Sequence, residues 1–512
     1  MATSYIKIRK KDNTQEQSSR DISWKNLRQT ENIIPVPFRL TLEDNHEALH
    51  CEEIVRLIPG KRIVAFGKWG DKHIVAKLFI EPRTAKRHLK KEIEGIDALI
   101  ASGIPTPTLL WRGSVQQKRI QILIFERIVD GISLDVIWNS KRNVDELSHL
   151  MKAITTEIAT QHVLGIVQTD LHMKNFLVTK KMIYTLDGGS IMHFDEILPK
   201  EQSLNHLALF FAQLGIGTDT LQKDLYKIYA DARGWLIKKP DLDYLNKTTL
   251  QWTEKRWQRY ERKIQRNSTS FARRKTANAL IMYDRAFQSA ELTQLLLDPE
   301  SAFQRSDSHI LKEGRSATVI QTTVNQFDIV IKRYNIKDKL HWLRRCLRSS
   351  RAASSWRLAQ RLRLFNVPTA RPIAFVENKK AGLRGTSYFL MEFVSGPNAA
   401  DYFDDYKKDE KRRSVVAERI ITLLINLAKL RLTHGDLKAT NILIENQQPV
   451  LIDLDGMTEH HTLYSLRNAF KKELLRFMKN WENRLNVYML FKKLISQLYE
   501  PLQEESDLTR KV

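Results

Sequence analysis

Apolar and polar positions follow the same order in two stretches of the chain. Residues 62–79 form two β-rich runs around a short polar turn, and residues 317–334 repeat this pattern with a turn near Asn325. Further along each stretch, apolar residues at i, i+4, i+7 and i+11 predict an amphipathic helix: Leu147, Met151, Ile154 and Ile158, then Val416, Ile420, Leu423 and Leu427. Strands first and helices later predict an α+β unit of two lobes in each half of the chain.

A polar segment after each predicted helix also repeats. Each contains an Asp, an Asn five residues later and an Asp twelve residues after that: Asp170, Asn175 and Asp187, then Asp436, Asn441 and Asp453. Upstream, GIPTP at 103–107 is echoed by NVPTA at 366–370, and the strand with Lys77 is echoed by the strand with Lys332. Features that recur in one order with matched spacing indicate two copies of one fold.

The repeat predicts four segments. We expect an N-terminal extension at 1–44, a first domain at 45–235, a basic helical linker at 236–304 and a second domain at 305–512.

Charge narrows the classes of partner. The 512 residues carry a formal net charge of +24, with basic runs at 254–275, 332–351 and 467–493. Such a charge favours nucleic acid, an anionic membrane surface or a phosphorylated ligand. No helix-turn-helix, zinc-finger or RNP signature occurs, which argues against nucleic acid. The two cysteines, Cys51 and Cys346, match no disulfide scaffold or zinc spacing.

The repeated Asp, Asn and Asp suit one kind of chemistry. A loop can aim the first Asp at a substrate hydroxyl, while the Asn and the second Asp face a common cation. Hard oxygen ligands completed by phosphate oxygens and water suit Mg²⁺. With a strand lysine to neutralise nucleotide phosphates, these are the parts that phosphoryl transfer from ATP requires.

The second copy resembles a known family. HGDLKATNILI at 434–444 and LIDLDGM at 451–457 look like the catalytic and metal-binding loops of protein-kinase-like folds. They are similar to those of the lipopolysaccharide core kinases, the Kdo/heptose kinases and InaA-type relatives of Gram-negative bacteria. The resemblance covers nearly all of the second copy and, more weakly, the first. It implies tandem bilobal protein-kinase-like domains that use ATP and Mg²⁺.

The resemblance also implies roles for residues of the second copy. Asp436 is the expected catalytic base, and Lys438 is expected to steady the γ-phosphate. Asn441 and Asp453 are expected to hold Mg²⁺.

Nucleotide contacts are implied in the same way. Lys332 is expected to contact the ATP phosphates, and Glu392 to begin the hinge that binds adenine through backbone groups. Glu92, fifteen residues after Lys77, is the expected ion-pair partner of that lysine. Matching positions of the first copy take the remaining roles: Asp170, Asn175, Asp187, Lys77 and Glu126.

Both copies depart from the family pattern. The first has Gln168 where the second has the loop histidine His434. The second has Ser355 at the position of Glu92, with Glu313 as a candidate substitute carboxylate. Neither has a full glycine-rich loop, since the candidate glycines are only Gly67 and Gly70 in the first copy and Gly314 in the second.

We therefore expect an ATP-dependent phosphotransferase that acts on a heptose or Kdo hydroxyl of the lipopolysaccharide inner core. It would be cytoplasmic and peripheral on the inner face of the inner membrane, where basic helices meet anionic lipid. One copy could be inactive. The alternatives are a protein or small-molecule kinase of the same fold, and a pseudokinase scaffold for envelope assembly. The sequence does not indicate an oligomeric state.

Overall fold

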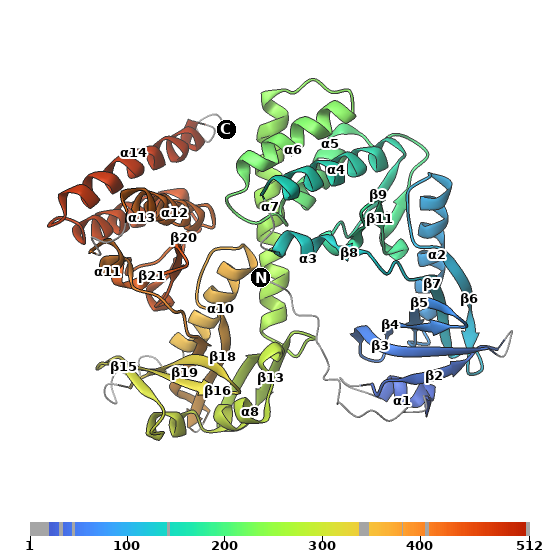
Figure 1. Cartoon of the computed structure of the whole chain (residues 1–512), viewed down its shortest axis with the longest axis horizontal. Helices are drawn as coiled ribbons and strands as arrows, with labels where there is room; N and C mark the ends of the chain where they lie inside the picture. The colour runs from blue at the N-terminus through green and yellow to red at the C-terminus, as the bar shows by residue number, and fades with distance from the viewer. Residues whose placement is uncertain are drawn as a thin grey trace. The chain divides into compact units, whose positions relative to one another are not determined.

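The computed structural model describes residues 20–29, 34–43, 47–140, 144–336, 348–380, 382–404 and 409–507. Cys346 and most of the basic run expected at 332–351 lie outside these residues. The chain divides into two compact units (Figure 1): unit 1 is Met1–Gln213 with Asp219–Glu254, and unit 2 is Leu214–Thr218 with Lys255–Val512. Unit 1 contains the first copy of the repeat, and unit 2 contains the second.

Unit 1 begins with a seven-stranded sheet of order β1-β2-β3-β4-β5-β7-β6. Its strands are antiparallel neighbours except for the parallel pair β1 and β2. The strand pair predicted at 62–79 is confirmed as β4 and β5. The strands are β1 Arg20–Asp21, β2 Phe38–Thr41, β3 Ala48–Ile58, β4 Arg62–Trp69, β5 Lys72–Phe79, β6 Leu109–Val115 and β7 Ile120–Glu126; helices α1 Trp24–Gln29 and α2 Ala85–Ala101 accompany them.

The rest of unit 1 is mainly helical. The predicted amphipathic helix is confirmed as α4, which buries Met151, Ile154 and Ile158. The helices are α3 Leu134–Asn139, α4 Val144–Val163, α5 Lys200–Phe211, α6 Asp219–Ala232 and the first part of α7 Lys239–Ile264. Short strands carry the site loops: β8 Ile132–Ser133, β9 Ile166–Gln168, β10 Phe176–Val178, β11 Ile183–Thr185 and β12 Ile191–His193.

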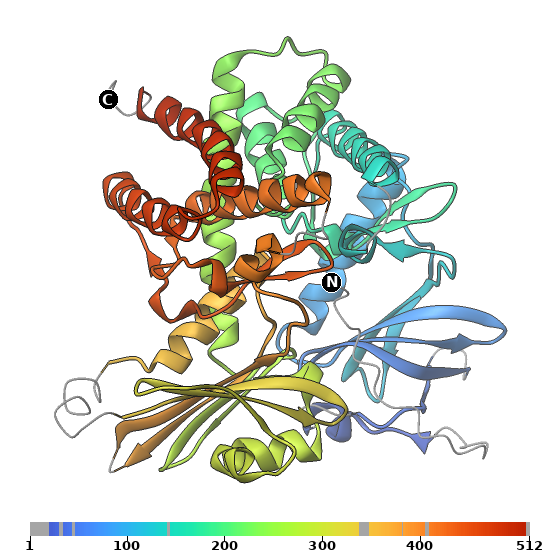
Figure 2. The ribbon, with the colours of Figure 1, turned by 60° about the vertical axis from the view of Figure 1, so that its left-hand side comes forward.

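Unit 2 has a sheet of order β13-β14-β18-β19-β17-β16-β15, whose twist is visible in Figure 2. Its last five strands repeat the order of β6, β7, β5, β4 and β3 in unit 1. Residues 236–304, expected as a helical linker, contain α7 and α8 Ala290–Leu297, but also β13 and β14, and β14 pairs with β18. The strands are β13 Phe271–Lys275, β14 Ala279–Asp284, β15 His309–Glu313, β16 Ala317–Val324, β17 Phe327–Tyr334, β18 Pro372–Lys380 and β19 Leu383–Glu392.

Helices form the second lobe of unit 2 (Figure 1). They are α11 Ala399–Asp404, α12 Glu410–Lys429, α13 Leu463–Lys479 and α14 Leu485–Asp507, while α10 Arg351–Leu364 packs against β18 and β19 of the sheet. The short strands are β20 Leu432–Thr433, β21 Ile442–Glu445, β22 Gln448–Leu451 and β23 Thr458–Glu459. The predicted helix over 416–427 is confirmed as the buried face of α12. The mixed α+β, two-lobed arrangement predicted from the sequence is thus present.

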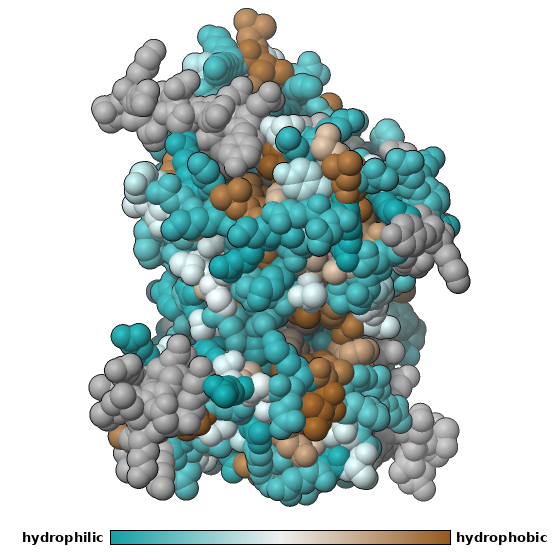
Figure 3. Space-filling model, turned by 90° about the vertical axis from the view of Figure 1, so that its left-hand side faces the viewer, coloured by the Kyte–Doolittle hydropathy of each residue, from teal (hydrophilic) through white to brown (hydrophobic). Residues whose placement is uncertain are grey.

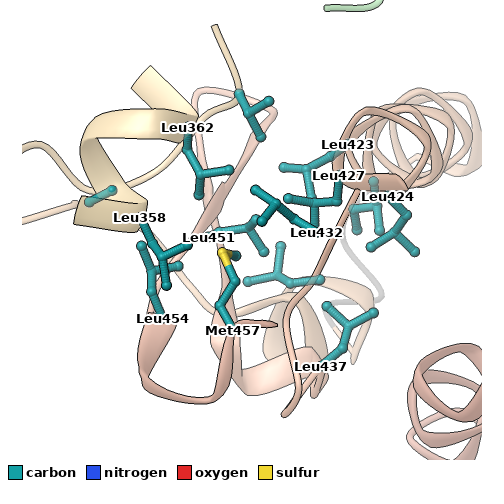
Figure 4. Close-up of a cluster of buried hydrophobic side chains, with 14 of the residues drawn as sticks. Leu358, Leu362, Leu423, Leu424, Leu427, Leu432, Leu437, Leu451, Leu454 and Met457 are labelled. Carbon is teal, nitrogen blue, oxygen red and sulfur yellow. The ribbon is translucent and has the colours of Figure 1, made fainter. Parts of the chain in front are cut away.

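A leucine-rich core holds the site loops of unit 2 in place. Figure 4 shows Leu358 of α10 against Leu454 and Leu451, while Leu423 and Leu427 of α12 approach from the other side. All five side chains are buried. Because close-packed apolar side chains resist displacement, the loops on either side of this core have fixed positions.

The surface gives a different picture. The face drawn in Figure 3 is mainly hydrophilic, and its apolar side chains form small separate patches. Within the described residues, no helix is both long enough and apolar enough to cross a bilayer.

Candidate active site

The two candidate catalytic loops have the same backbone construction. Each follows a short strand, β9 or β20, and enters a turn of 3₁₀-helix at Met173–Asn175 or Ala439–Asn441. The amide of Leu186 donates to the Asn175 carbonyl at 2.8 Å, and that of Ile452 donates to the Asn441 carbonyl at 3.1 Å. The residue after each of these amides is the second Asp of the repeat, so the Asn and that Asp lie side by side.

The second Asp of each copy has an uncommon backbone conformation. Asp187 has φ +67° and Asp453 has φ +59°, in the left-handed region that non-glycine residues rarely adopt. Such outliers cluster at functional sites, where the surrounding structure enforces them.

The Asn side chains are oriented for a cation. Asn175 Nδ2 donates to the Asp170 carbonyl at 2.8 Å, and Asn441 Nδ2 donates to the Asp436 carbonyl at 2.8 Å. Since the nitrogen is taken, each amide oxygen remains for a ligand. An amide oxygen beside a carboxylate fits Mg²⁺, which takes its other ligands from phosphates and water. The described residues hold no cluster of three or more His, Cys, Asp or Glu side chains suited to a metal.

In the first copy, the strand lysine has the expected partner. Lys77 on β5 forms an ion pair with Glu92 of α2, and its Nζ lies 3.9 Å from Asp187 Oδ1. Glu92 is only 1% exposed. Its other oxygen accepts a hydrogen bond from the Gly189 amide at 3.1 Å. The buried carboxylate is therefore compensated by a cation and a backbone donor, as burial requires.

Two glycines allow α2 to approach the loop that follows Asp187. A Cβ on Gly95 would lie 1.9 Å from the Gly188 carbonyl oxygen, and a Cβ on Gly188 would lie 2.4 Å from the Glu92 carbonyl oxygen. Real side chains cannot reach such distances, so only glycine fits at both positions. The close contact explains why a carboxylate on α2 can reach both Lys77 and Gly189.

Arg56, near the end of β3, interacts electrostatically with both aspartates of the first copy. Burial lowers the pKa of Arg56, and the neighbouring Arg62 adds to this effect, while the charges of Asp187 and Asp170 oppose it. The charges of the predicted base and the predicted metal ligand of the first copy thus both act on the Arg56 guanidinium.

In the second copy, cations flank the candidate base. Lys438 Nζ lies 3.0 Å from Asp436 Oδ2, and Arg476 Nη1 of α13 lies 3.4 Å from Asp436 Oδ1. Arg476 also donates to the Gly435 carbonyl, and Glu473, one turn earlier on α13, accepts from the Gly435 amide. Helix α13 therefore fixes the backbone on which Asp436 is presented.

The loop histidine braces the same backbone. His434 Nε2 donates to the Ile452 carbonyl at 2.9 Å and so joins the catalytic loop to the strand before Asp453. Burial lowers the pKa of His434, which keeps the imidazole neutral near pH 7. In the first copy, both side-chain polar atoms of Gln168 are buried without a hydrogen-bond partner. Because the first copy has Gln168 in place of a histidine, its loop lacks the hydrogen bond that His434 makes in the second copy.

The strand lysine of the second copy differs from that of the first. Lys332 on β17 lies 2.5 Å from Asp453 Oδ1 and 2.7 Å from Asp455 Oδ2. Burial alone would raise the pKa of Asp453, but the adjacent ammonium of Lys332 brings that pKa below its usual value. Glu313, the substitute carboxylate suggested by the sequence, is not the partner: it lies on the exposed strand β15. The suggestion was wrong, because both carboxylates beside Lys332 come from the loop after β22.

A pocket opens beside Lys332. It is lined on the sheet side by Phe389 and Met391 and on the loop side by Leu451 and Asp453. Glu392 follows at the end of β19; its amide donates to the Arg371 carbonyl at 2.8 Å, and its carboxylate lies 3.5 Å from Arg371 Nη1. Of these Glu392 groups, the carbonyl therefore remains for an adenine at this edge. In the first copy, the Glu126 amide is likewise taken, by the Thr108 carbonyl at 2.9 Å.

The glycines expected over the phosphates need a correction in the first copy. Gly67 lies within β4, and Gly70 lies in the turn between β4 and β5. The hairpin one strand earlier, between β3 and β4, holds Gly60 instead, and this hairpin corresponds to the one that holds Gly314 between β15 and β16. Both hairpins contain glycine, so glycine content alone could not separate them.

Other site residues escaped sequence reasoning. Arg476 and Glu473 lie about forty residues beyond Asp436, so only the packing of α13 brings them to the loop. Tyr334, whose hydroxyl donates to Asp455 Oδ1 at 2.5 Å, could have been found: it lies two residues after Lys332 and so on the same face of β17.

Comparison with known proteins agrees with this geometry. A search of curated proteins found no match. A family model does match, over residues 68–189 and 301–486, which is more than half of the chain and includes both site loops. The matched segments lie in both copies. The chain belongs to the lipopolysaccharide kinase (Kdo/WaaP) family.

Proposed function

We propose that the protein is an ATP-dependent kinase that transfers the γ-phosphate to a heptose or Kdo hydroxyl of the lipopolysaccharide inner core. One observation carries the proposal: each copy gathers a loop aspartate, an asparagine with its amide oxygen available, a left-handed aspartate and a strand lysine. Each copy would form one kinase-like domain, at 45–235 and 305–512.

The chemistry follows from these positions. Asp436 accepts the proton of the sugar hydroxyl as that oxygen bonds to the γ-phosphorus and the bond to ADP breaks. Lys438 balances charge on the transferred phosphoryl group, and Lys332 does so on the nucleotide. Mg²⁺ held by Asn441 and Asp453 would neutralise the phosphate oxygens. Positioning and electrostatics supply the catalysis, and no phosphoenzyme forms.

The acceptor side carries positive charge. Helix α13, which positions Asp436, presents Lys471, Lys472 and Lys479 to solvent beside Leu475. Basic side chains attract anionic lipid at about 1 kcal/mol each. We therefore place the acceptor and an anionic membrane surface on this side, with the protein peripheral on the cytoplasmic face of the inner membrane.

Phosphate transfer to extracted core acceptor tests this function. Full-length protein with ATP and Mg²⁺ should label the acceptor, and Asp436→Asn should lower the rate by about a thousandfold. Asp307→Asn is the matched control, because Asp307 pairs with Arg305 in an exposed turn away from the loop of Asp436. Absence of labelling by the wild-type protein, on intact lipopolysaccharide as well as on delipidated core, would contradict the proposal.

A second candidate has a specific observation behind it. In the first copy, Gln168 leaves the catalytic loop without its brace, although Lys77 and Glu92 form the complete pair. The first copy would then bind nucleotide and regulate the second, as a pseudokinase does. Unchanged transfer in Asp170→Asn would favour this division, whereas a comparable loss in both aspartate variants would favour two active copies.

A further inference from the structure

The residues around the strand lysine differ between the copies at three matched positions. Where the first copy has Glu92 on its helix, the second has Ser355. Where the first has Gly189, two residues after Asp187, the second has Asp455, two residues after Asp453. Where the first has Phe79, two residues after Lys77, the second has Tyr334. The carboxylate has thus moved from the helix to the loop, and a hydroxyl accompanies it.

Asp455 is fully engaged in the second copy. Its Oδ2 lies 2.7 Å from Lys332 Nζ, while its Oδ1 accepts from the Tyr334 hydroxyl at 2.5 Å and from the Ser355 hydroxyl at 3.1 Å. Tyr334 and Ser355 are 3% and 1% exposed, and the two hydroxyls are 3.1 Å apart. Both carboxylate oxygens therefore have buried partners. The Asp455 carboxylate thus serves Lys332 and is not available to a metal ion.

Packing explains the exchange. In the first copy, Gly95 and Gly188 let the helix backbone touch the loop. At the matching positions of the second copy, Leu358 and Leu454 are both buried, and Figure 4 shows them against each other. Two leucine side chains thus separate helix and loop in the second copy, where the first copy has backbone against backbone. Because Leu358 and Leu454 lie between α10 and the loop, a carboxylate on the loop is nearer to Lys332 than one on α10 would be.

We infer that Asp455 is the positioning residue for Lys332 and replaces the helix carboxylate in the second copy, with Tyr334 and Ser355 holding it in place. When nucleotide binds, Asp453 then leaves Lys332 and coordinates Mg²⁺. Asp455 meanwhile keeps the Lys332 ammonium directed at the phosphates. This inference rests on the proposed function, because it presumes that Lys332 contacts nucleotide.

Nucleotide binding to the full chain tests the inference, with Lys77→Met present throughout to isolate the second copy. ATP dissociation constants are measured by calorimetry with Mg²⁺ and with EDTA. Asp455→Asn should weaken binding about tenfold under both conditions, as expected for loss of one charged hydrogen bond. Asp453→Asn, the matched control two residues away, should weaken binding only when Mg²⁺ is present.

A rescue variant separates positioning from general structure. Asp455→Gly should weaken binding like Asp455→Asn, and adding Ser355→Glu, which recreates the arrangement of the first copy, should restore at least part of the affinity. Tyr334→Phe should cost about threefold. Thermal unfolding confirms that each variant is folded.

The outcomes distinguish this inference from the function beneath it. If the Lys77→Met protein binds no ATP, the proposed function of the second copy fails. If that protein binds ATP and Asp455→Asn binds it within twofold, the inference alone is overturned. An Asp455→Asn defect that vanishes in EDTA would also overturn it, because Asp455 would then be a metal ligand.

Discussion

The two copies share what the chemistry needs and differ in how it is held. In both, an Asn donates to the carbonyl of the candidate base and an Asp in a left-handed conformation follows a short strand. The lysine, however, pairs with helix residue Glu92 in the first copy and with loop residue Asp455 in the second. The ammonium of the strand lysine can thus be positioned by a carboxylate on the helix or by one on the loop, provided that the neighbouring packing leaves room for that carboxylate.

The supports of the catalytic loop differ in the same manner. In the first copy, His206 Nε2 of α5 donates to the Gln168 carbonyl at 2.6 Å. In the second, Glu473 of α13 accepts from the Gly435 amide, and His434 adds a bond to Ile452. The two loops are therefore held by different side chains, with Gln213 also bonded to the first loop and Arg476 to the second. This difference implies unequal sensitivity of the two units to mutation and pH.

The strand lysines offer the largest expected effect. Lys332→Met should lower transfer by at least about a hundredfold, because it removes the charge that we propose faces the nucleotide phosphates. Lys77→Met should match this loss only if the first copy also turns over. Labelled-phosphate transfer measures both, and Lys411→Met at the exposed start of α12 is the control. Equal activity of Lys332→Met and the control would remove the second copy from the catalytic account.

The next largest expected effect concerns the leucine-rich core of unit 2. Leu427→Ala deletes a fully buried side chain that packs near the catalytic loop, and should cost about 3 kcal/mol of unfolding free energy. The exposed Leu475, at 59%, should tolerate Ala within about 0.5 kcal/mol. Calorimetric unfolding should show the transition of unit 2 moving and that of unit 1 staying. Similar shifts in both variants would argue against the core as described.

Acid should destabilise unit 1 more than unit 2. Burial lowers the pKa of His206 to about 4, and His162, hydrogen-bonded to it at 2.6 Å, has a pKa well below its usual value for the same reason. The folded state then binds fewer protons than the unfolded state between about pH 6.5 and 4. Stability is therefore complete above pH 6.5 and is lost as pH falls, by about 2 to 3 kcal/mol for His206.

Urea unfolding at pH 7.5 and pH 5 measures this acid effect. His206→Gln should flatten the pH dependence of the unit 1 transition, with wild type as reference. A pH dependence that persists unchanged in the variant would assign it to other groups.

The smallest expected effect concerns the loop brace. Gln168→Met removes a buried amide without a partner at little change in volume, and should leave unit 1 as stable or up to about 1 kcal/mol more stable. His434→Met breaks the bond to Ile452 and should destabilise unit 2 by about 1 kcal/mol. Opposite signs in urea unfolding would sharpen the comparison; a clear loss of stability in Gln168→Met would mean that the amide has a partner.

Local pattern was enough to predict the strand pairs at 62–79 and 317–334 and the helices α4 and α12, because each pattern lies within a short stretch of chain. It missed β13 and β14, which lie in the segment expected to be a helical linker. The partner of Lys332 was not predictable in this way. It depends on Leu358 and Leu454 filling the helix–loop contact, and these lie almost one hundred residues apart. Glu313 was close in sequence but lies on an exposed strand. Side-chain pairing across lobes needs the packed structure.

Counting nucleotide sites tests the central claim most directly, namely that each copy gathers a nucleotide and a cation beside a carboxylate. Calorimetric titration of the full-length chain with Mg²⁺ and a non-hydrolysable ATP analogue should give two bound nucleotides per chain. Lys77→Met should remove or weaken one and Lys332→Met the other. Binding of one nucleotide or none, or sites insensitive to both substitutions, would contradict the account.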